Sequence, residues 1–202
     1  MMKNSPTKFF LIRHGEVANN ADKCYNGHND VDLSAEGLSQ MEAIADRLKT
    51  EPIKAVYCSD LIRTVKGGRI IAEKHSLKII SLQKLRELNY GRWDGKKLDD
   101  IKRLYPEELK ARYDDIVNYR IQGGETLIEL NNRILQVIKD IINKHKGESI
   151  AVVSHGGVNR IILLWALNID LKNFHRIQQN YAALNIVNFY DNGNVIVELM
   201  NG

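Results

Sequence analysis

The chain has 202 residues, of which 44% are hydrophobic and 27% charged, and its formal net charge is +4. This length suits one domain with a sizeable core, and this composition excludes a wholly disordered chain. The longest strongly apolar run, residues 161–167, is too short to span a bilayer. We therefore predict one folded domain, residues 1–202, with no membrane partner.

The pattern of charged residues and the number of cysteines indicate which partners and which cellular location to expect. Basic residues occur in short blocks of mixed sign, as in residues 96–100, with no long basic run interleaved with aromatic residues. This pattern favours no nucleic-acid partner and leaves an anionic substrate open. Cys24 and Cys58 lack CxxC spacing and allow one disulfide at most, and no apolar secretory segment precedes the first strand-like run. We expect a reducing, cytoplasmic setting.

Strand-like and helix-like segments alternate in the first part of the chain. The predicted strands span residues 8–12, 55–58 and 77–80. Apolar residues at helical spacing predict helices over residues 35–49, with Ser34 as the N-cap, and over residues 60–75. Gly67 and Gly68 predict a loose middle in the second helix, since a mid-helix glycine costs roughly 1 kcal/mol relative to alanine.

Residues 82–123 break this alternation. The segment is charged, dotted with aromatic residues and poor in strands. Short helices are predicted over residues 98–105 and 107–119, and Pro106 suits the N1 position of the second, where its missing N–H costs nothing. We predict that the segment is an insertion that caps one end of a sheet.

The remaining segments complete an α/β pattern. Thr126 and Glu129 form a capping box at the start of a helix predicted over residues 127–144. Residues 150–153 are apolar on both faces, as in a central parallel strand, and a buried helix is predicted over residues 158–167. A turn signal at residues 191–194 predicts a hairpin of strands 184–190 and 195–199. One α/β domain with an internal cap accounts for all of these elements.

Chemically reactive residues lie just beyond strand-like runs or in the loops that follow them. They are Arg13 with His14, Arg63, Glu87 and His155. Ligands of open α/β sheets bind outside the carboxyl ends of the strands, so we expect these residues to meet in one crevice. Imidazole is a competent nucleophile near neutral pH, and the planar guanidinium forks of arginines suit phosphoryl oxygens.

These residues predict a phosphate site with a histidine nucleophile. His14 would hold the phosphoryl group as a phosphohistidine, and Glu87 would exchange protons with the leaving oxygen and with water. The groups expected to stabilise the phosphoryl charge are Arg13, Arg63, His155 and the backbone N–H groups of Gly156 and Gly157. Taken singly, each residue is more often structural; their joint occurrence in this order favours function. Cys24, Cys58 and His28 lack partners at metal-ligand spacing, so no metal site is predicted.

The motifs resemble the histidine phosphatase superfamily, in the branch related to cofactor-dependent phosphoglycerate mutase, over nearly the whole chain. The similar segments are residues 11–16, 25–27, 32–37, 58–63, 85–95, 123–126 and 153–157. The resemblance implies a three-layer fold with a mostly parallel sheet between helices, a small helical cap, and no metal or cofactor. The phosphate-contacting positions that it implies are Arg13, Asn20, Gly27, Arg63, His155 and Gly156.

Two departures from the family pattern stand next to the predicted site. Val17 replaces a residue that often carries a hydroxyl, which removes one possible hydrogen bond to phosphate. Residues 64–68, with their two glycines, replace the usual helix turn after Arg63. The positions of the nucleophile, the proton donor, the two arginines and the second histidine all match.

The resemblance leaves the reaction open. The compact interval between Glu87 and His155 favours a phosphatase, similar in style to α-ribazole phosphatases and broad small-metabolite phosphatases. A mutase would call for more basic residues in the cap, where Lys102 and Arg103 are interspersed with Asp99 and Asp100. A non-catalytic phospho-ligand module is disfavoured because both His14 and Glu87 are present.

We therefore expect a small phosphorylated metabolite as the partner, with its identity and the oligomeric state left open. The cap tyrosines allow two readings: they stack on a base-bearing substrate, or, by default, they belong to the core of the cap. These tyrosines are Tyr105, Tyr113 and Tyr119.

Overall fold

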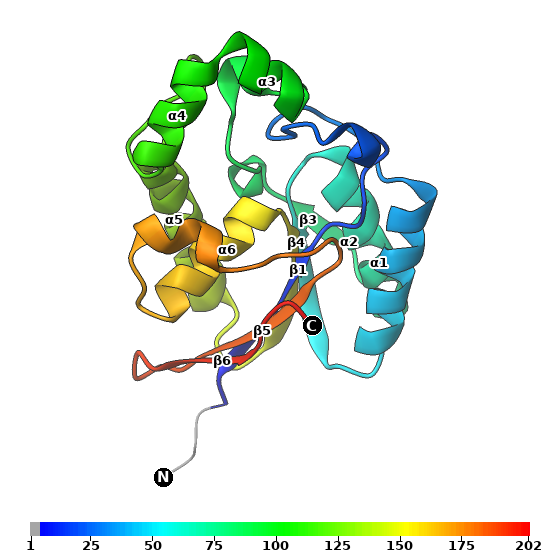
Figure 1. Ribbon diagram of the computed structural model, residues 1–202. Coiled ribbons are helices and arrows are strands. Elements are labelled where there is room, and N and C mark those ends of the chain that lie inside the picture. Colours follow the sequence, from blue (N-terminus) through cyan, green and yellow to red (C-terminus); the bar gives the residue numbers. More distant parts are fainter. Residues whose placement is uncertain (1–4) are drawn as a thin grey trace.

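The computed structural model describes residues 5–202 and contains one six-stranded sheet in the order β3-β2-β4-β1-β5-β6 (Figure 1). The strands are β1 (Thr7–Arg13), β2 (Ile53–Cys58), β3 (Ile79–Ser81), β4 (Ser149–Ser154), β5 (Leu184–Phe189) and β6 (Val195–Leu199). β1 to β4 are mutually parallel, whereas β5 pairs antiparallel with β1 and β6 antiparallel with β5. The expected α/β fold with a mostly parallel sheet is confirmed.

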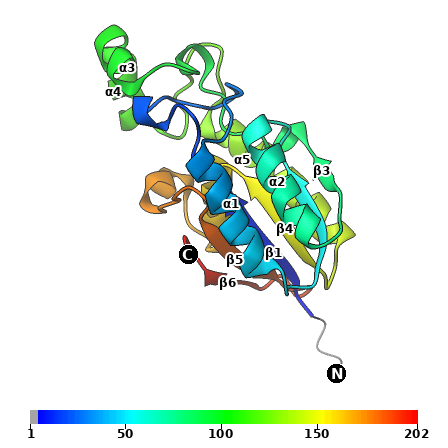
Figure 2. The ribbon, with the colours of Figure 1, turned by 90° about the vertical axis from the view of Figure 1, so that its right-hand side faces the viewer.

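Helices cover both faces of the sheet (Figure 2). One face carries α1 (Ala35–Leu48) and α2 (Ile62–Lys74), and the other carries α5 (Leu127–Lys144) and α6 (Gly156–Ala166). The central strand β4 shows why both faces are buried: Ile150 and Val152 join the core under α5 and α6, while Ala151 and Val153 join the core under α1 and α2. Alternation of apolar side chains on a strand buried on both sides produces this continuous apolar run.

The segment between β3 and α5 forms the cap. It contains α3 (Leu98–Leu104) and α4 (Pro106–Asp114), which lie beyond the end of the sheet at which β1 and β4 finish (Figures 1 and 2). Pro106 occupies the first turn of α4, as predicted. A small apolar cluster of Trp93, Ile101 and Ile121 supports the cap from inside. Short 3₁₀ turns span Asn20–Asp22, Gln83–Leu85, Gly91–Trp93 and Leu171–Arg176.

Several predicted boundaries are wrong by a few residues. The second cap helix ends at Asp114 instead of continuing to residue 119, because Asp115 and Asn118 form a local side-chain turn that replaces the helix. β3 is Ile79–Ser81, two residues later than the predicted start. α6 begins at Gly156, two residues before the predicted start, and His155 is its N-cap residue.

The prediction of a loose middle in α2 is wrong. The helix is continuous from Ile62 to Lys74. A Cβ atom at Gly67 would lie 2.9 Å from the Met41 side chain, and one at Gly68 would lie 3.3 Å from Cys58 Cβ. The two glycines therefore let α2 approach α1 and the sheet closely, and this packing outweighs their low helix propensity.

Two further findings concern the described residues as a whole. Within residues 5–202, no helix has the length and apolar character needed to cross a membrane. Cys24 and Cys58 are both free thiols, so the single disulfide that the sequence allowed is not formed.

Candidate active site

His14 lies where the chain leaves β1 and is 6% exposed. Its Nδ1 lies 2.8 Å from the carbonyl oxygen of Gly15, so Nδ1 carries the proton and Nε2 keeps its lone pair. Burial lowers the pKa of His14 well below 6.5, the positive charges of Arg63 and Arg13 lower it further, and the bond to Gly15 opposes them. The imidazole is therefore neutral and oriented at neutral pH, as a nucleophile requires.

His155 stands beside His14, with ring centroids 5.3 Å apart and the rings edge to face. It is fully buried; its Nε2 lies 2.8 Å from Ser59 Oγ, and its Nδ1 has no partner in the described chain. Burial lowers its pKa well below 6.5, and the neighbouring cations lower it further. Ser59 was not predicted as a site residue, because the family-like segment 58–63 was matched only for Arg63.

Two hydroxyl groups behind His155 bear on which of its ring nitrogens carries the proton. Ser59 Oγ lies 2.7 Å from Thr64 Oγ1, which is also within reach of the Leu61 carbonyl at 2.9 Å. Thr64 Oγ1 gives its one proton to a carbonyl, so Ser59 donates to Thr64 and accepts from Nε2–H of a neutral His155. Nδ1 of a neutral His155 is then an acceptor, and it becomes a donor when the ring takes up a second proton.

Arg13 is held from two sides. Its Nη1 donates to the Gln179 carbonyl at 2.6 Å, and its guanidinium lies 4.1 Å above the ring centroid of Tyr181. Gln179 is fixed in turn by buried amide hydrogen bonds with Asn159 and Asn185. Nε of Arg13 is buried and has no partner among residues 5–202. Burial lowers the pKa of Arg13 below the usual value of an arginine, but a guanidinium stays charged at neutral pH.

Arg63 is fully buried near the start of α2 and bonds only to carbonyl oxygens. Its Nη1 donates to Asn29 at 2.8 Å, and its Nη2 donates to Gly27 at 2.7 Å. Within residues 5–202, neither Arg13 nor Arg63 has a carboxylate ion-pair partner, and Nε of Arg63 is also unpartnered. A fully buried and a half-buried cation, each with an unpartnered Nε, favour a bound anion.

Gly27 and Asn20 do not reach the pocket that His14 lines. Gly27 donates its N–H to Asp94 Oδ1 at 2.6 Å and supplies a carbonyl to Arg63, so it anchors the arginine. Asn20 is exposed and donates to Glu16 Oε2 at 2.8 Å. The contacts to phosphate expected at these two positions stay predictions.

Glu87 reaches the site from the loop that follows β3 and is 8% exposed. Its Oε1 accepts the N–H of Leu88 and its Oε2 accepts the N–H of Gly157, each at 2.8 Å. The N–H of Gly157, expected to face phosphate, is therefore used by Glu87, whereas Gly156 lines the pocket. Both Glu87 and His14 line this pocket.

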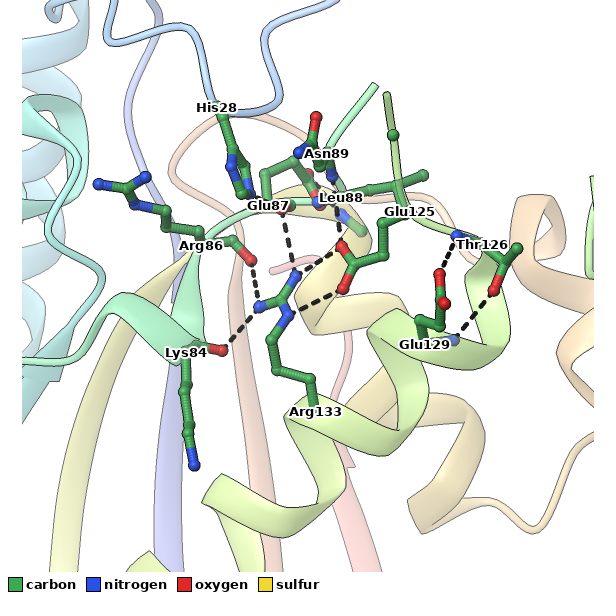
Figure 3. A network of polar contacts seen from close by, with 12 residues as sticks. His28, Lys84, Arg86, Glu87, Leu88, Asn89, Glu125, Thr126, Glu129 and Arg133 are labelled. Carbon is green, nitrogen blue, oxygen red and sulfur yellow. Dashed lines mark hydrogen bonds and ion pairs between the residues drawn. The ribbon is translucent and has the colours of Figure 1, made fainter. Parts of the chain in front are cut away.

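Arg133 of α5 holds the backbone that carries Glu87 (Figure 3). It donates to the carbonyls of Lys84 at 2.7 Å and Arg86 at 2.9 Å, with a longer contact of 3.4 Å to Glu87. It also forms a two-pronged ion pair with Glu125, at 2.9 and 2.8 Å. The capping box of Thr126 and Glu129 starts the helix just before Arg133, as predicted, and so positions it.

The pocket in front of His14 has a volume of about 300 Å³. Arg13, His14 and Glu87 line it, whereas Arg63 and His155 are fully buried and are not among its lining residues. Side chains that sequence reasoning missed complete the wall: Lys23, Cys24, Tyr25, Asn26, Tyr90, Leu98, Arg160 and Tyr181. They come from loops, the cap and α6. Tyr25, Asn26 and Tyr90 lie within segments that resemble the family, but no site role was predicted for them.

The cap contributes less charge to the pocket than its composition suggests. Its basic side chains form ion pairs within or beside the cap: Lys97 with Asp22, Lys102 with Asp99, and Arg103 with Asp100. Tyr105 and Tyr119 pack against the small core of the cap, and Tyr113 is 63% exposed. None of the three tyrosines lines the pocket, so the default reading of core residues holds for Tyr105 and Tyr119.

Comparison with known proteins agrees with this geometry. The pattern of the histidine phosphatase superfamily (branch 1) matches residues 9–202. Phosphoserine phosphatase 1 of Hydrogenobacter thermophilus is 29% identical over 192 residues, covering 95% of this chain and 91% of its own. A probable phosphoglycerate mutase GpmB of Yersinia enterocolitica is 30% identical over 185 residues, covering 90% and 85%. A putative α-ribazole-5′-P phosphatase structure from Escherichia coli has a TM-score of 0.91 at 22% identity, covering 98% and 97%.

Proposed function

The chain belongs to the histidine phosphatase superfamily, and from this premise we propose that it is a single-domain, metal-independent phosphatase of a small phosphomonoester. The observation that carries the proposal is the state of His14. Its Nδ1 donates to the Gly15 carbonyl, and its ring lies near the fully buried Arg63 and the half-buried Arg13, neither of which has a carboxylate partner in the described chain. This arrangement suits a neutral nucleophile that attacks a phosphoryl group held by positive charge.

The reaction proceeds in two displacements. Nε2 of His14 forms a bond to phosphorus as the ester oxygen–phosphorus bond breaks, and Glu87 gives a proton to the leaving oxygen. Water then attacks the phosphohistidine, Glu87 takes a proton from it, and the phosphorus–nitrogen bond breaks to release inorganic phosphate. Arg13 and Arg63 donate to the phosphoryl oxygens throughout, and His155 adds a donor when the anion's charge leads its Nδ1 to take up a proton.

The substrate candidates are α-ribazole-5′-phosphate and other phosphorylated metabolites. The related Hydrogenobacter protein is named a phosphoserine phosphatase, which adds phosphoserine to these candidates. The free thiols Cys24 and Cys58 are in keeping with a cytoplasmic setting.

Mutase-type phosphoryl transfer is the second candidate, favoured by the name of the Yersinia relative. A mutase has to retain and reorient a doubly phosphorylated intermediate, which requires free positive charge in the cap. Three cap cations, Lys97, Lys102 and Arg103, are paired with aspartates, which reduces that charge and supports the phosphatase instead; Arg112 of α4 keeps an unpartnered Nη1. A non-catalytic module is disfavoured because nucleophile and acid are both retained.

The test is phosphate release from a generic phosphomonoester, with a chelator present, by the native protein and by His14→Ala. We expect the native activity to survive the chelator and His14→Ala to lose roughly 10³-fold or more, as for other catalytic nucleophiles. Full activity in His14→Ala would refute the assignment of His14 as the nucleophile. Interconversion of phosphoglycerates without phosphate release would identify the mutase.

A further inference from the structure

Asp94 is a half-buried carboxylate for which the reaction above gives no role. It lies in the same family-like segment, residues 85–95, that carries Glu87. Its two oxygens accept only backbone N–H groups, that of Gly27 at 2.6 Å and that of His28 at 3.1 and 3.2 Å. In the described chain Asp94 forms an ion pair with no cation. Its charge therefore acts first on the backbone of the loop that contains Gly27.

The same two peptide groups bind Arg63 through their carbonyls. The carbonyl of Asn26 and the N–H of Gly27 belong to one peptide group, and the carbonyl of Gly27 and the N–H of His28 belong to the next. Both carbonyls accept from Nη2 of Arg63, at 3.2 and 2.7 Å. The described chain has no cis peptide bond, and in a trans peptide group the N–H and C=O point in opposite directions. Asp94 and Arg63 therefore lie on opposite sides of two bridging peptide groups.

This arrangement stabilises Arg63 without occupying all of its donors. Each peptide dipole has its positive end at N–H and its negative end at C=O, so an anion at the first and a cation at the second both favour its orientation. Burial lowers the pKa of Arg63, and the charges of Glu87, Asp30 and Asp94 oppose that effect. Nη1 of Arg63 donates to Asn29, whereas Nε is buried and unpartnered in the described chain. A carboxylate bound directly to Arg63 would compete with phosphate for the guanidinium, whereas one that acts through peptide groups does not.

The loop that holds Arg63 also contacts the segment that carries Glu87. The two run so close that a Cβ atom at Gly27 would lie 2.7 Å from Asp94 Oδ1. The ring of His28 lies beside Glu87, with Nε2 at 3.1 Å from the Glu87 carbonyl oxygen (Figure 3). A change at Asp94 can therefore act through Arg63 or through Glu87, and the test has to separate the two.

We propose, resting on the proposed phosphatase function, that Asp94 is a positioning residue for Arg63: through the peptide groups of residues 26–28 it fixes the guanidinium with Nε free for a phosphoryl oxygen. Asp94 is not among the residues that line the pocket, so it acts on the substrate only through other groups. Loss of its charge-assisted hydrogen bonds lets the loop and the guanidinium shift. The expected result is weaker binding of the phosphoryl group, with proton transfer by Glu87 unchanged.

The first test is a double-mutant cycle of Asp94→Ala and Arg63→Met, with kcat/KM measured for 4-nitrophenyl phosphate. We expect Asp94→Ala to lower kcat/KM about tenfold in the native background and less than about threefold in the Arg63→Met background. Asp94→Asn keeps an acceptor of the same shape and should lose less than Asp94→Ala. Asp32→Asn, the control, removes a nearby carboxylate that pairs with Lys66 and should keep the native value. A tenfold loss that persists in the Arg63→Met background would overturn the inference.

A comparison of leaving groups separates Arg63 from Glu87. The leaving oxygen of phenyl phosphate needs a proton more than that of 4-nitrophenyl phosphate, because phenol is the weaker acid. A misplaced Glu87 therefore lowers kcat/KM more for phenyl phosphate, whereas a misplaced Arg63 lowers it equally for both esters. We expect equal losses in Asp94→Ala. A larger loss for phenyl phosphate would assign Asp94 to the positioning of Glu87 and overturn the inference.

Binding of inorganic phosphate separates this inference from the phosphatase itself. Calorimetric titration needs no turnover, and we expect about tenfold weaker binding of phosphate by Asp94→Ala than by the native protein. If Asp94→Ala does not fold, Asp94→Asn gives the same comparison with a smaller expected loss. Equal affinities in variant and native protein would overturn the inference even if the native protein hydrolyses both esters. Weaker binding by the variant of a native protein that hydrolyses neither ester would uphold the inference and refute the phosphatase.

Discussion

Glu87 occupies the space that any side chain at position 157 would need. A Cβ atom added to Gly157 would lie 2.2 Å from Glu87 Oε1, while the backbone N–H of Gly157 donates to Oε2 at 2.8 Å. Glycine at this position therefore both admits the carboxylate and binds it. The neighbouring Gly156 has ordinary room, since a Cβ atom there would lie 3.5 Å from Arg13 Nε.

We predict that Gly157→Ala lowers kcat about 10²-fold, because it displaces the proton donor by about an ångström while leaving its chemistry intact. Gly156→Ala, the matched control one residue earlier on α6, should lose much less. Steady-state kinetics on a generic phosphomonoester measures both. Equal losses of kcat in the two variants would show that alanine disturbs the start of α6 and not the position of Glu87.

At the scale of elements, α5 positions the acid although it contributes no side chain to the pocket. Arg133 binds carbonyls on both sides of the turn that precedes Glu87 and is itself paired with Glu125 (Figure 3). Side-chain exposures of 21% for Arg133 and 15% for Glu125 put this pair largely out of water. Removal of the arginine leaves a carboxylate and backbone carbonyls without donors, which costs more than an exposed pair would.

Arg133→Met should therefore lower kcat/KM about tenfold to a hundredfold through misplacement of Glu87, and should also lower the Tm. Arg120→Met is the control, since Arg120 pairs with Glu129 at the start of the same helix but is exposed. We expect that variant to keep its activity and nearly all of its stability. A lower Tm in Arg133→Met with an unchanged kcat/KM would show that Arg133 has only a structural role.

At the scale of the whole molecule, most of the histidines have a lowered pKa. Burial is the main cause that lowers the pKa of five of the six below 6.5, and the effect is large for His14 and His155. Below pH 6.5 the histidines of the unfolded chain become protonated, whereas the buried histidines of the folded protein stay neutral. The free energy of unfolding therefore has its full value above pH 6.5 and decreases as the pH falls toward the lowered pKa values.

We predict that the free energy of unfolding falls between pH 6.5 and 5.5, by up to about 1.4 kcal/mol per pH unit for each histidine that stays neutral in the fold. Urea titrations at a series of pH values measure this slope. His14→Ala should show a shallower slope, since one of the two strongly buried imidazoles is gone. A free energy that is constant from pH 8 to 5.5 would contradict the buried, neutral histidine pair.

Local patterns in the sequence indicated most of the elements and the reactive residues. The strand-end position of His14, the capping box at Thr126 and the apolar run of β4 are each set by neighbours in the chain. Such patterns reflect steric preference, hydrogen bonding and burial over a few residues, so these elements can be predicted without knowledge of the tertiary structure. The misread glycines Gly67 and Gly68 show the limit, because their role depends on Met41 and Cys58.

The sequence by itself determined the alternating α/β elements, the family resemblance and the reactive groups Arg13, His14, Arg63, Glu87 and His155. Only the tertiary structure decided which unmarked residues surround them: Ser59 behind His155, Tyr181 against Arg13, Arg133 beneath Glu87, and Arg160 in the pocket wall. The strand order puts β4 between β1 and β2, so residues far apart in the chain become neighbours. Contacts made across the sheet leave no periodic trace in the sequence, because their partners lie on different segments.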